Sequence, residues 1–294
     1  MHPRRRMAFA MLLTTVLTSL LASPVAGTEP TRPVATRPTL AERPLTDAEQ
    51  AASDRKVAAA LAYVADQQAV DAQLLPLSCL TPNGSLDADT TDAPCISIPR
   101  YYLGVQARDQ IRSHYCGPAV GQVISNYAWN TGSGNKYTQT QIAQWMQTDI
   151  RGQTSAPELE DGLELATARA PRRPANWDWV ITEVRDLNRN GSSGDELHAF
   201  VRTNVSGSKM PLAIPVKPHD ANSLYNLASW PRPVGSVGHW IAAYGWYGNW
   251  IGGDFARTYY TDSSRDEGGA TGYFWNATRH LAGMIREHTG RLVW

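Results

Sequence analysis

One cysteine in this chain has the local sequence of a nucleophile. Cys116 is followed at once by Gly117 and Pro118, and apolar residues then recur at three- and four-residue steps, which is typical of one buried helical face. Proline suits the first turn of a helix, where its missing N–H would have no partner. Cys116 is therefore expected at or just before a helix N-terminus, where free N–H groups and the helix dipole favour the reactive thiolate. We interpret it as a catalytic nucleophile.

A cysteine nucleophile needs a base, and His239 is the best candidate among the seven histidines. It directly follows Gly238 and opens an apolar run, which predicts a position at the start of a strand beside a cleft. His114 is too close to Cys116 along the backbone to face it easily. The others lie in the signal region or in polar or helical contexts. A buried histidine with a purely structural role remains the alternative.

A third group must orient that imidazole by accepting its second N–H. Asp262 ends a predicted strand that pairs with the strand beginning at His239. If Trp246 faces Phe255 in one antiparallel hairpin, Asp262 lies directly opposite His239 on the same side of the sheet. A slip of one residue would turn one of them away, which makes the prediction sharp. The alternatives are a solvated turn aspartate at this position, or a role for the loop residues Asn249 and Asp254.

Three short motifs together resemble a known family. The stretch from Gln110 to Ala119, the stretch 237–241 around His239, and the stretch 259–262 ending in Asp262 look like the cysteine, histidine and aspartate blocks of the C39-like cysteine peptidases. That family is a branch of the papain-like superfamily, and the resemblance covers roughly residues 100 to 265. It implies an α+β, papain-like cysteine protease fold. An N-terminal helical part would carry the nucleophile, and a C-terminal antiparallel sheet would carry the histidine and the aspartate.

The resemblance also implies a role for Gln110, six positions before Cys116. In papain-like enzymes a glutamine at this offset donates its amide to the oxyanion, together with the backbone N–H of the nucleophile. The alternatives are an ordinary polar glutamine, or Gln122 as a weaker substitute. The implied activity is hydrolysis of an amide bond in a peptide or protein substrate, with no metal or organic cofactor. An acyltransferase that crosslinks amines, and a non-catalytic relative that binds peptides, remain open.

The first 27 residues predict a secretory signal peptide: three arginines precede a short apolar run and then small residues. That run is shorter than the roughly 20 residues of a membrane-spanning helix. We therefore expect a secreted, extracellular protein with no membrane anchor after cleavage. The best-known C39 peptidases are domains of membrane transporters that trim leader peptides, so that substrate is not carried over. The 27 basic and 27 acidic residues give no support to a nucleic-acid partner.

The other two cysteines, Cys79 and Cys95, flank a loop-like segment rich in Thr, Asn, Gly, Asp and Pro. Outside the cell such a pair is expected to form a disulfide, which leaves Cys116 free. A zinc site is disfavoured because no Cys-x-x-Cys or paired-histidine spacing occurs. The stretch 188–195 lacks the spacing of a calcium loop and is interpreted as a solvated turn.

These observations predict four regions. They are a signal peptide (1–27), a Pro-rich flexible tail (28–45), an N-terminal helix with the stapled loop (46–98), and a C39-like peptidase domain (99–294). Periodicity and capping residues predict helices from Thr46 to about Ala69, and over 118–129, 138–146, 157–168 and from 196. Short strands are expected near 101–105 and 211–216.

Overall fold

The described part of the chain is built around a seven-stranded sheet whose strands pair antiparallel. The computed structural model describes residues 42–74, 99–148, 153–185, 193–219, 224–235, 237–248, 256–264 and 268–294. All of them belong to one unit, Ala35–Trp294. The predicted signal peptide, most of the Pro-rich tail and the Cys79–Cys95 disulfide lie outside the described residues, as do the candidates Asn249 and Asp254.

The sheet has the order β2-β7-β3-β4-β5-β6, and β1 pairs with β4 off this path. β4 is its centre, because it pairs with β1, β3 and β5. The strands are β1 (Arg100–Tyr102), β2 (Ile181–Glu183), β3 (Leu212–Val216), β4 (His239–Tyr247), β5 (Arg257–Asp262), β6 (Gly272–Ala277) and β7 (Arg291–Val293). The chain is therefore α+β with an antiparallel sheet, as expected.

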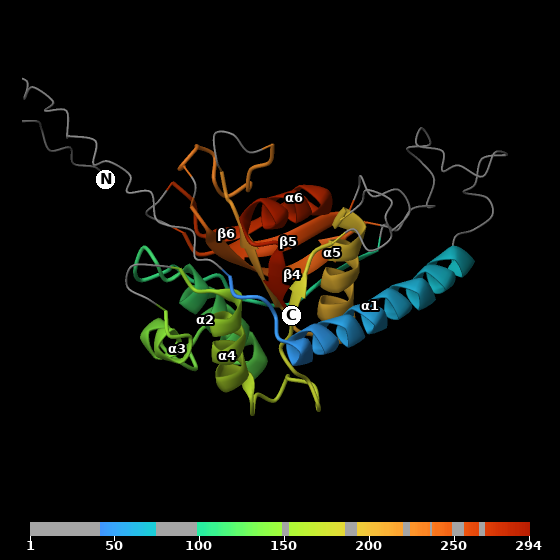
Figure 1. Ribbon diagram of the computed structural model, residues 1–294, viewed down its shortest axis with the longest axis horizontal. Helices are drawn as coiled ribbons and strands as arrows, with labels where there is room; N and C mark the ends of the chain where they lie inside the picture. The colour runs from blue at the N-terminus through green and yellow to red at the C-terminus, as the bar shows by residue number, and fades with distance from the viewer. Residues whose placement is uncertain are drawn as a thin grey trace, which may run out of the picture. The chain divides into compact units, whose positions relative to one another are not determined.

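Helices lie on either side of this sheet in Figure 1: α6 appears above β4 and β5, and α2, α3 and α4 appear below. α2 contacts α3, α4 and β4, whereas α6 contacts α5, β3 and β5. The helices are α1 (Asp47–Leu74), α2 (Cys116–Trp129), α3 (Gln139–Trp145), α4 (Ala156–Thr167), α5 (Ser193–Arg202) and α6 (Thr278–His288), and a π-helix η2 (Thr203–Gly207) follows α5. No helix among the described residues combines the length and apolarity that a membrane span requires.

α2 begins at Cys116, as the sequence predicts, and ends at Asn130 in the left-handed conformation with φ 54°. The residue before it, Tyr115, provides no side-chain cap, so the first N–H groups of the helix have no capping side chain there. Gly117 lets the helix approach its neighbour closely. A Cβ at this position would lie 2.3 Å from the Thr154 hydroxyl oxygen. The small residue after the cysteine therefore allows the tight packing that holds the helix start in place.

α1 packs on the rest of the domain. It contacts α5, β2 and η2. Thr46 and Glu49 form the predicted reciprocal cap: the Thr46 N–H donates to the Glu49 carboxylate at 2.6 Å, and the Glu49 N–H donates to the Thr46 hydroxyl at 3.3 Å. Val57 and Val64 are buried on its inner face.

The predicted register of the β4–β5 hairpin is wrong. Ala242 pairs with Thr261. Continuing this pairing by one residue puts Asp262 opposite Ile241, and not opposite His239. The two residues are diagonal neighbours across the strands, a distance that a histidine side chain can bridge.

A β-bulge at Tyr244 keeps the two side chains on one face of the sheet. Near the hairpin tip Trp246 pairs with Thr258, three positions later than predicted. Because side chains alternate between faces, an odd shift would turn Asp262 away from the face of His239. The register changes by one residue around Tyr244, so the shift at the other end of the hairpin is two. The bulge thus puts His239 and Asp262 on the same face of the sheet, as the sequence analysis required.

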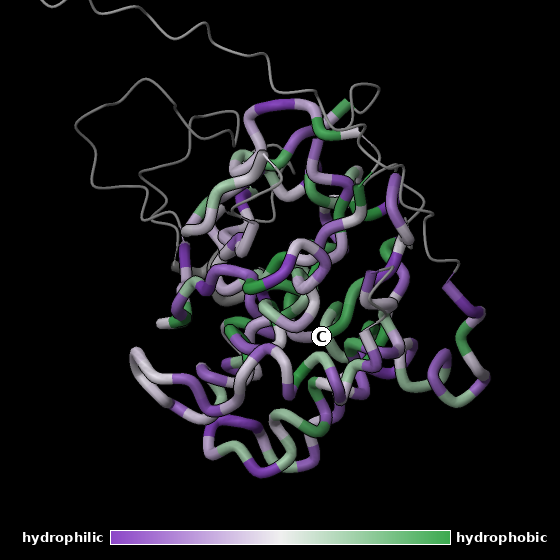
Figure 2. Tube along the Cα trace, turned by 90° about the vertical axis from the view of Figure 1, so that its left-hand side faces the viewer, coloured by the Kyte–Doolittle hydropathy of each residue, from purple (hydrophilic) through white to green (hydrophobic). Residues whose placement is uncertain are grey.

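The core lies between the sheet and its helices. In Figure 2 hydrophobic stretches gather around the C-terminus, whereas the loops at the lower edge are mostly hydrophilic. The C-terminal Trp294 is fully buried, and α4 contributes Leu159, Leu163 and Ala166, each with no exposed surface. α3 likewise buries Ile142, and Met146 at its C-cap is buried too, whereas Trp145 is only partly buried.

We expect Leu163→Ala to lower the free energy of unfolding by about 2–5 kcal/mol, because it opens a cavity in a fully packed site. Leu165→Ala on the same helix is the matched control. Its side chain is 58% exposed, and its loss should cost no more than about 0.5 kcal/mol. Urea unfolding followed by tryptophan fluorescence measures both, and equal losses would contradict the assignment of the buried face.

Candidate active site

The imidazole of His239 and the carboxylate of Asp262 form a buried pair. His239 Nε2 lies 2.8 Å from Asp262 Oδ1. The two residues are 3% and 1% exposed. A carboxylate can only accept here, so Nε2 carries the proton and donates it. The two residues predicted to meet do so, through the diagonal of the hairpin.

Three further donors surround the same carboxylate. Ser229 Oγ and Trp230 Nε1 donate to Asp262 Oδ2 at 2.6 and 2.9 Å, and the Ser264 backbone N–H donates to Oδ1 at 2.8 Å. With His239 this makes four hydrogen bonds, which is how a buried carboxylate is kept charged. His219 in turn bonds the carbonyl of Trp230 at 2.8 Å between its Nδ1 and that oxygen.

These supporting residues were missed from the sequence. Ser264 had a usable signal, because an aspartate often accepts the N–H two residues later in an Asx turn. Ser229 and Trp230 had none: they come from a loop between β3 and β4, and only folding brings them to the end of β5. The spacing of residues in the sequence therefore could not predict their bonds to Asp262.

Cys116 lies near the same imidazole. Its side chain is close enough to His239 to contribute to the raised pKa of that histidine. Cys116 is 4% exposed and, among the described residues, is a free cysteine. The structure therefore brings three predicted residues from α2, β4 and β5 near one another.

The charges of this group support one another. Burial alone would lower the pKa of His239, but the Asp262 charge and the hydrogen bonds to Asp262 and Cys116 outweigh it and raise the pKa to about 10. Burial alone would raise the pKa of Asp262. The cationic His239 and the donated hydrogen bonds, including those from Ser229 and Ser264, hold its pKa below the usual value. The favoured state at neutral pH is an imidazolium held against a carboxylate.

Gln110 is fixed beside the segment that carries Asp262. Its backbone N–H donates to the Ser263 carbonyl at 2.9 Å, and its side-chain Nε2 donates to the Ser113 carbonyl at 3.1 Å. The side chain is buried, so Gln110 is not an ordinary surface glutamine. An amide nitrogen has two N–H groups, and the bond to Ser113 uses one.

The weaker candidate Gln122 has a structural role. Its Nε2 donates to the Tyr137 carbonyl at 2.8 Å, and its Oε1 accepts from Gln139 Nε2 at 3.1 Å. Gln139 also bonds the backbone on both sides of Gln110: its Nε2 donates to the Asp109 carbonyl and its Oε1 accepts from the Ile111 N–H. The bonds to the loop that carries Gln110 thus come from Gln139. Gln122 bonds Gln139 and the Tyr137 carbonyl.

The other histidines have surroundings of their own. His288 is close enough to His239 for their charges to interact, and burial, Lys217 and His239 lower the pKa of His288 to about 4. His198 is buried in α5, where burial and then the charge of Arg202 lower its pKa to about 3. His280 stacks on Tyr225, and His114 packs edge-on against Tyr115. Within the described ranges, no group of three or more His, Cys, Asp or Glu side chains has the arrangement of a metal site.

Comparison with solved structures finds four chains that are similar to this one. One of them, the peptidase domain of Streptococcus ComA, a bi-functional ABC transporter involved in a quorum sensing pathway, aligns with 64% of this chain and 96% of its own length, at 13% identity and a TM-score of 0.34. No protein-family model matches the sequence, and no curated protein matches it either.

The pairing of His239 with Asp262 should make stability depend on pH in a defined window. A raised pKa stabilises the fold fully below the ordinary histidine value of 6.5, and this stabilisation is lost as pH rises toward about 10. The lowered pKa of Asp262 stabilises above the ordinary value of 3.8 and is lost in acid. The melting-temperature difference between the native chain and His239→Gln should therefore be largest between pH 3.8 and pH 6.5.

Thermal unfolding of both proteins across the pH range measures this difference. Other titrating groups are common to the two proteins and largely cancel. A difference that stays flat from pH 5 to pH 9, or grows with rising pH, would contradict the ion pair.

Proposed function

We propose that this chain is a secreted cysteine peptidase or amide hydrolase that acts through Cys116, His239 and Asp262. The observation that carries the proposal is an imidazole that interacts with both a free thiol and a buried carboxylate. A purely structural histidine has no need of a nearby cysteine together with a carboxylate that accepts four hydrogen bonds. This arrangement is what nucleophilic catalysis requires: a nucleophile, a base and a group that orients the base.

In the proposed reaction the Cys116 thiolate attacks the carbonyl carbon of an amide, and the carbonyl oxygen becomes an oxyanion. His239 Nδ1 gives its proton to the departing amine as the C–N bond breaks, which leaves an acyl-enzyme on Cys116. The now neutral His239 takes a proton from water, and the resulting hydroxide equivalent attacks the thioester. The acid product leaves, and the thiolate–imidazolium pair is restored. Asp262 keeps Nε2 protonated throughout.

The oxyanion would be stabilised by two kinds of donor. The backbone N–H of Cys116 belongs to the uncapped start of α2, where the helix dipole also favours negative charge. The second donor is the Gln110 N–H that the Ser113 carbonyl does not use. The hydrogen bonds from Gln139 to the flanking backbone would keep this amide in position.

Secretion is part of the proposal, on the strength of residues 1–27, and it has a chemical consequence. In an oxidising compartment an unpaired thiol is exposed to disulfide formation. Cys116 is 4% exposed, which leaves little of its surface open to attack by dissolved thiol compounds.

p-Nitrophenyl acetate tests the proposal without knowledge of the natural substrate, because it is small enough to reach a sulfur with little exposed surface. The native chain should release p-nitrophenol and carry one acetyl group on Cys116, located by peptide mass spectrometry. Cys116→Ala should give no acetylation there. Gln110→Ala should slow acetylation about 100- to 1,000-fold, since one oxyanion donor is lost.

Gln122→Ala is the matched control, because it removes a buried glutamine amide whose bonds are structural. It should keep the acetylation rate within a few-fold of the native value, provided that circular dichroism shows the same fold. Absence of acetyl-Cys116 in the folded native chain would contradict the proposal. Transfer of the acetyl group to an added amine, in preference to water, would instead indicate an acyltransferase.

A further inference from the structure

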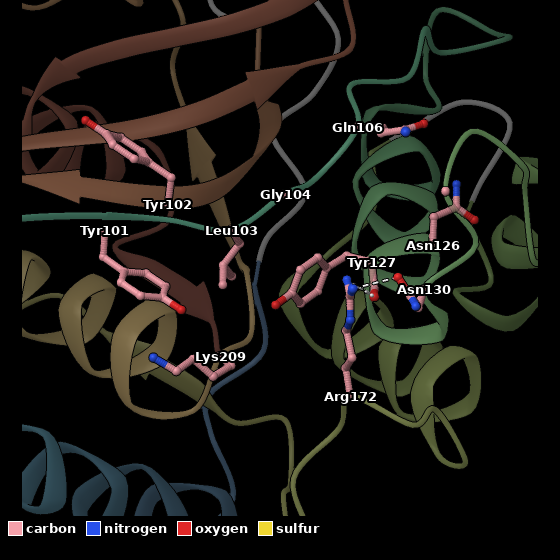
Figure 3. Close-up of a pocket in the computed structure, with 11 residues that line it drawn as sticks. Tyr101, Tyr102, Leu103, Gly104, Gln106, Asn126, Tyr127, Asn130, Arg172 and Lys209 are labelled. Atoms are coloured by element: carbon pink, nitrogen blue, oxygen red, sulfur yellow. Dashed lines mark hydrogen bonds between the residues drawn. The ribbon is translucent and has the colours of Figure 1, made fainter.

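A cavity of about 590 Å³ opens at the C-terminal end of α2, whereas Cys116 is at the N-terminal end. Its walls come from β1 with the residues that follow it, from the last turns of α2, and from the segments around Arg172 and Lys209 (Figure 3). A volume of this size holds a small molecule or a few residues of a peptide.

The walls of this cavity carry positive charge. Two cationic side chains, Lys209 and Arg172, line it, and no lining residue is acidic. The Lys209 ammonium lies 4.1 Å from the centre of the Tyr101 ring, and the Arg172 guanidinium lies 4.7 Å from that of Tyr127. An aromatic face holds a cation without neutralising it, so the charge stays available to a ligand.

Both cations are held in place by the surrounding structure. Arg172 donates to the Tyr127 carbonyl at 3.2 Å and to Asn130 Oδ1 at 2.6 Å. Lys209 has φ 58°, a left-handed conformation that is costly for a lysine. The buried amide of Asn204 keeps this turn by donating to the carbonyls of the two residues after Lys209, at 3.0 and 3.1 Å.

Between the two cations lie hydroxyl groups suited to a peptide backbone. Tyr101 and Tyr127 point their hydroxyls toward one another across the cavity, whereas Tyr102 points away (Figure 3). Burial raises the pKa of Tyr127, so its hydroxyl stays protonated at neutral pH. A protonated phenol both donates and accepts, which matches the N–H and C=O groups of an amide.

We propose that this cavity binds an acidic peptide segment, with carboxylates near Lys209 and Arg172 and backbone amides at the two tyrosine hydroxyls. The inference deepens the proposed function and rests on it in one respect: the segment would belong to the substrate. Eleven helical residues separate Cys116 from Tyr127, about 16 Å along the axis of α2. An extended chain covers this distance in about five residues. Substrates with an acidic segment at least that far from the cleaved bond are thus favoured.

Isothermal titration of the full chain carrying Cys116→Ala tests binding apart from turnover. The probes are N-acetylated, amidated tetraglutamate and its neutral counterpart tetraglutamine. Tetraglutamate should bind saturably and more weakly as NaCl is added, and tetraglutamine should not bind. Lys209→Gln and Arg172→Gln should each weaken binding about 2- to 5-fold, as expected for exposed ion pairs.

Lys136→Gln is the matched control. Lys136 is also exposed and also rests on an aromatic ring, 3.8 Å from the centre of Trp129, but it does not line the cavity. Its loss should leave the affinity unchanged. Equal effects of Lys136→Gln and Lys209→Gln, equal binding of the two peptides, or no saturable binding of tetraglutamate would each overturn the proposal. Binding of oligogalacturonate without binding of tetraglutamate would overturn it in favour of an acidic saccharide.

The two proposals fail separately. Tetraglutamate binding that depends on Lys209 and Arg172, in a chain whose Cys116 is not acetylated by p-nitrophenyl acetate, would support the peptide site and refute the hydrolase. Acetylation of Cys116 without tetraglutamate binding would do the reverse.

Discussion

The structure depends on a charged pair in a place where charges are costly. His239 and Asp262 are almost fully buried, and removing two ions from water costs several kcal/mol for each of them unless their partners replace the lost hydration. For the Asp262 carboxylate, the lost hydration is replaced by hydrogen bonds. Ser229, Trp230 and the Ser264 N–H donate to it in addition to the imidazole. Hydrogen bonds in such numbers are more than a simple core contact requires. The proposed function accounts for this cost, because the thiol of Cys116 also interacts with the imidazole.

Three elements must be correctly placed for the thiol, the imidazole and the carboxylate to meet. α2 delivers the thiol at its first residue, held close to its neighbour because Gly117 has no side chain. β4 delivers the imidazole at its first residue, and β5 delivers the carboxylate at its last. The bulge at Tyr244 sets the relative phase of the two strands. An uninterrupted ladder continued from the hairpin tip would have pointed the carboxylate to the other face.

Much of this could be read from the sequence, and the exceptions have physical reasons. Local signals sufficed for α2, α4 and the capped start of α1, because proline, glycine and capping residues act within a few positions. The pairing of His239 with Asp262 was also predicted, but through a register that is wrong by two residues. Hairpin register depends on loop length and bulges, and neither leaves a pattern in the residue types of the strands. His239 and Asp262 still share one face of the sheet because the error was even.

The residues that bond Asp262 and those that line the cavity at the end of α2 could not be predicted. Trp230 and Lys209 lie in segments without periodicity, and their partners are distant in sequence. Their roles become visible only in the folded chain. There the indole N–H of Trp230 donates to the Asp262 carboxylate, and the Lys209 ammonium lies over the Tyr101 ring. Residues whose role is to position or to attract, rather than to react, are recognised by contact and not by spacing.

The central claim is that the buried pair at His239 activates the sulfur of Cys116. The rate of alkylation of Cys116 by iodoacetamide, followed against pH in the native chain and in His239→Gln, tests it most directly. The account predicts rapid alkylation of the native chain near pH 6, where an ordinary thiol with its pKa of about 8.5 hardly reacts, and loss of this reactivity in the variant. Identical profiles for the two proteins, with reactivity that rises only in alkaline solution, would contradict it.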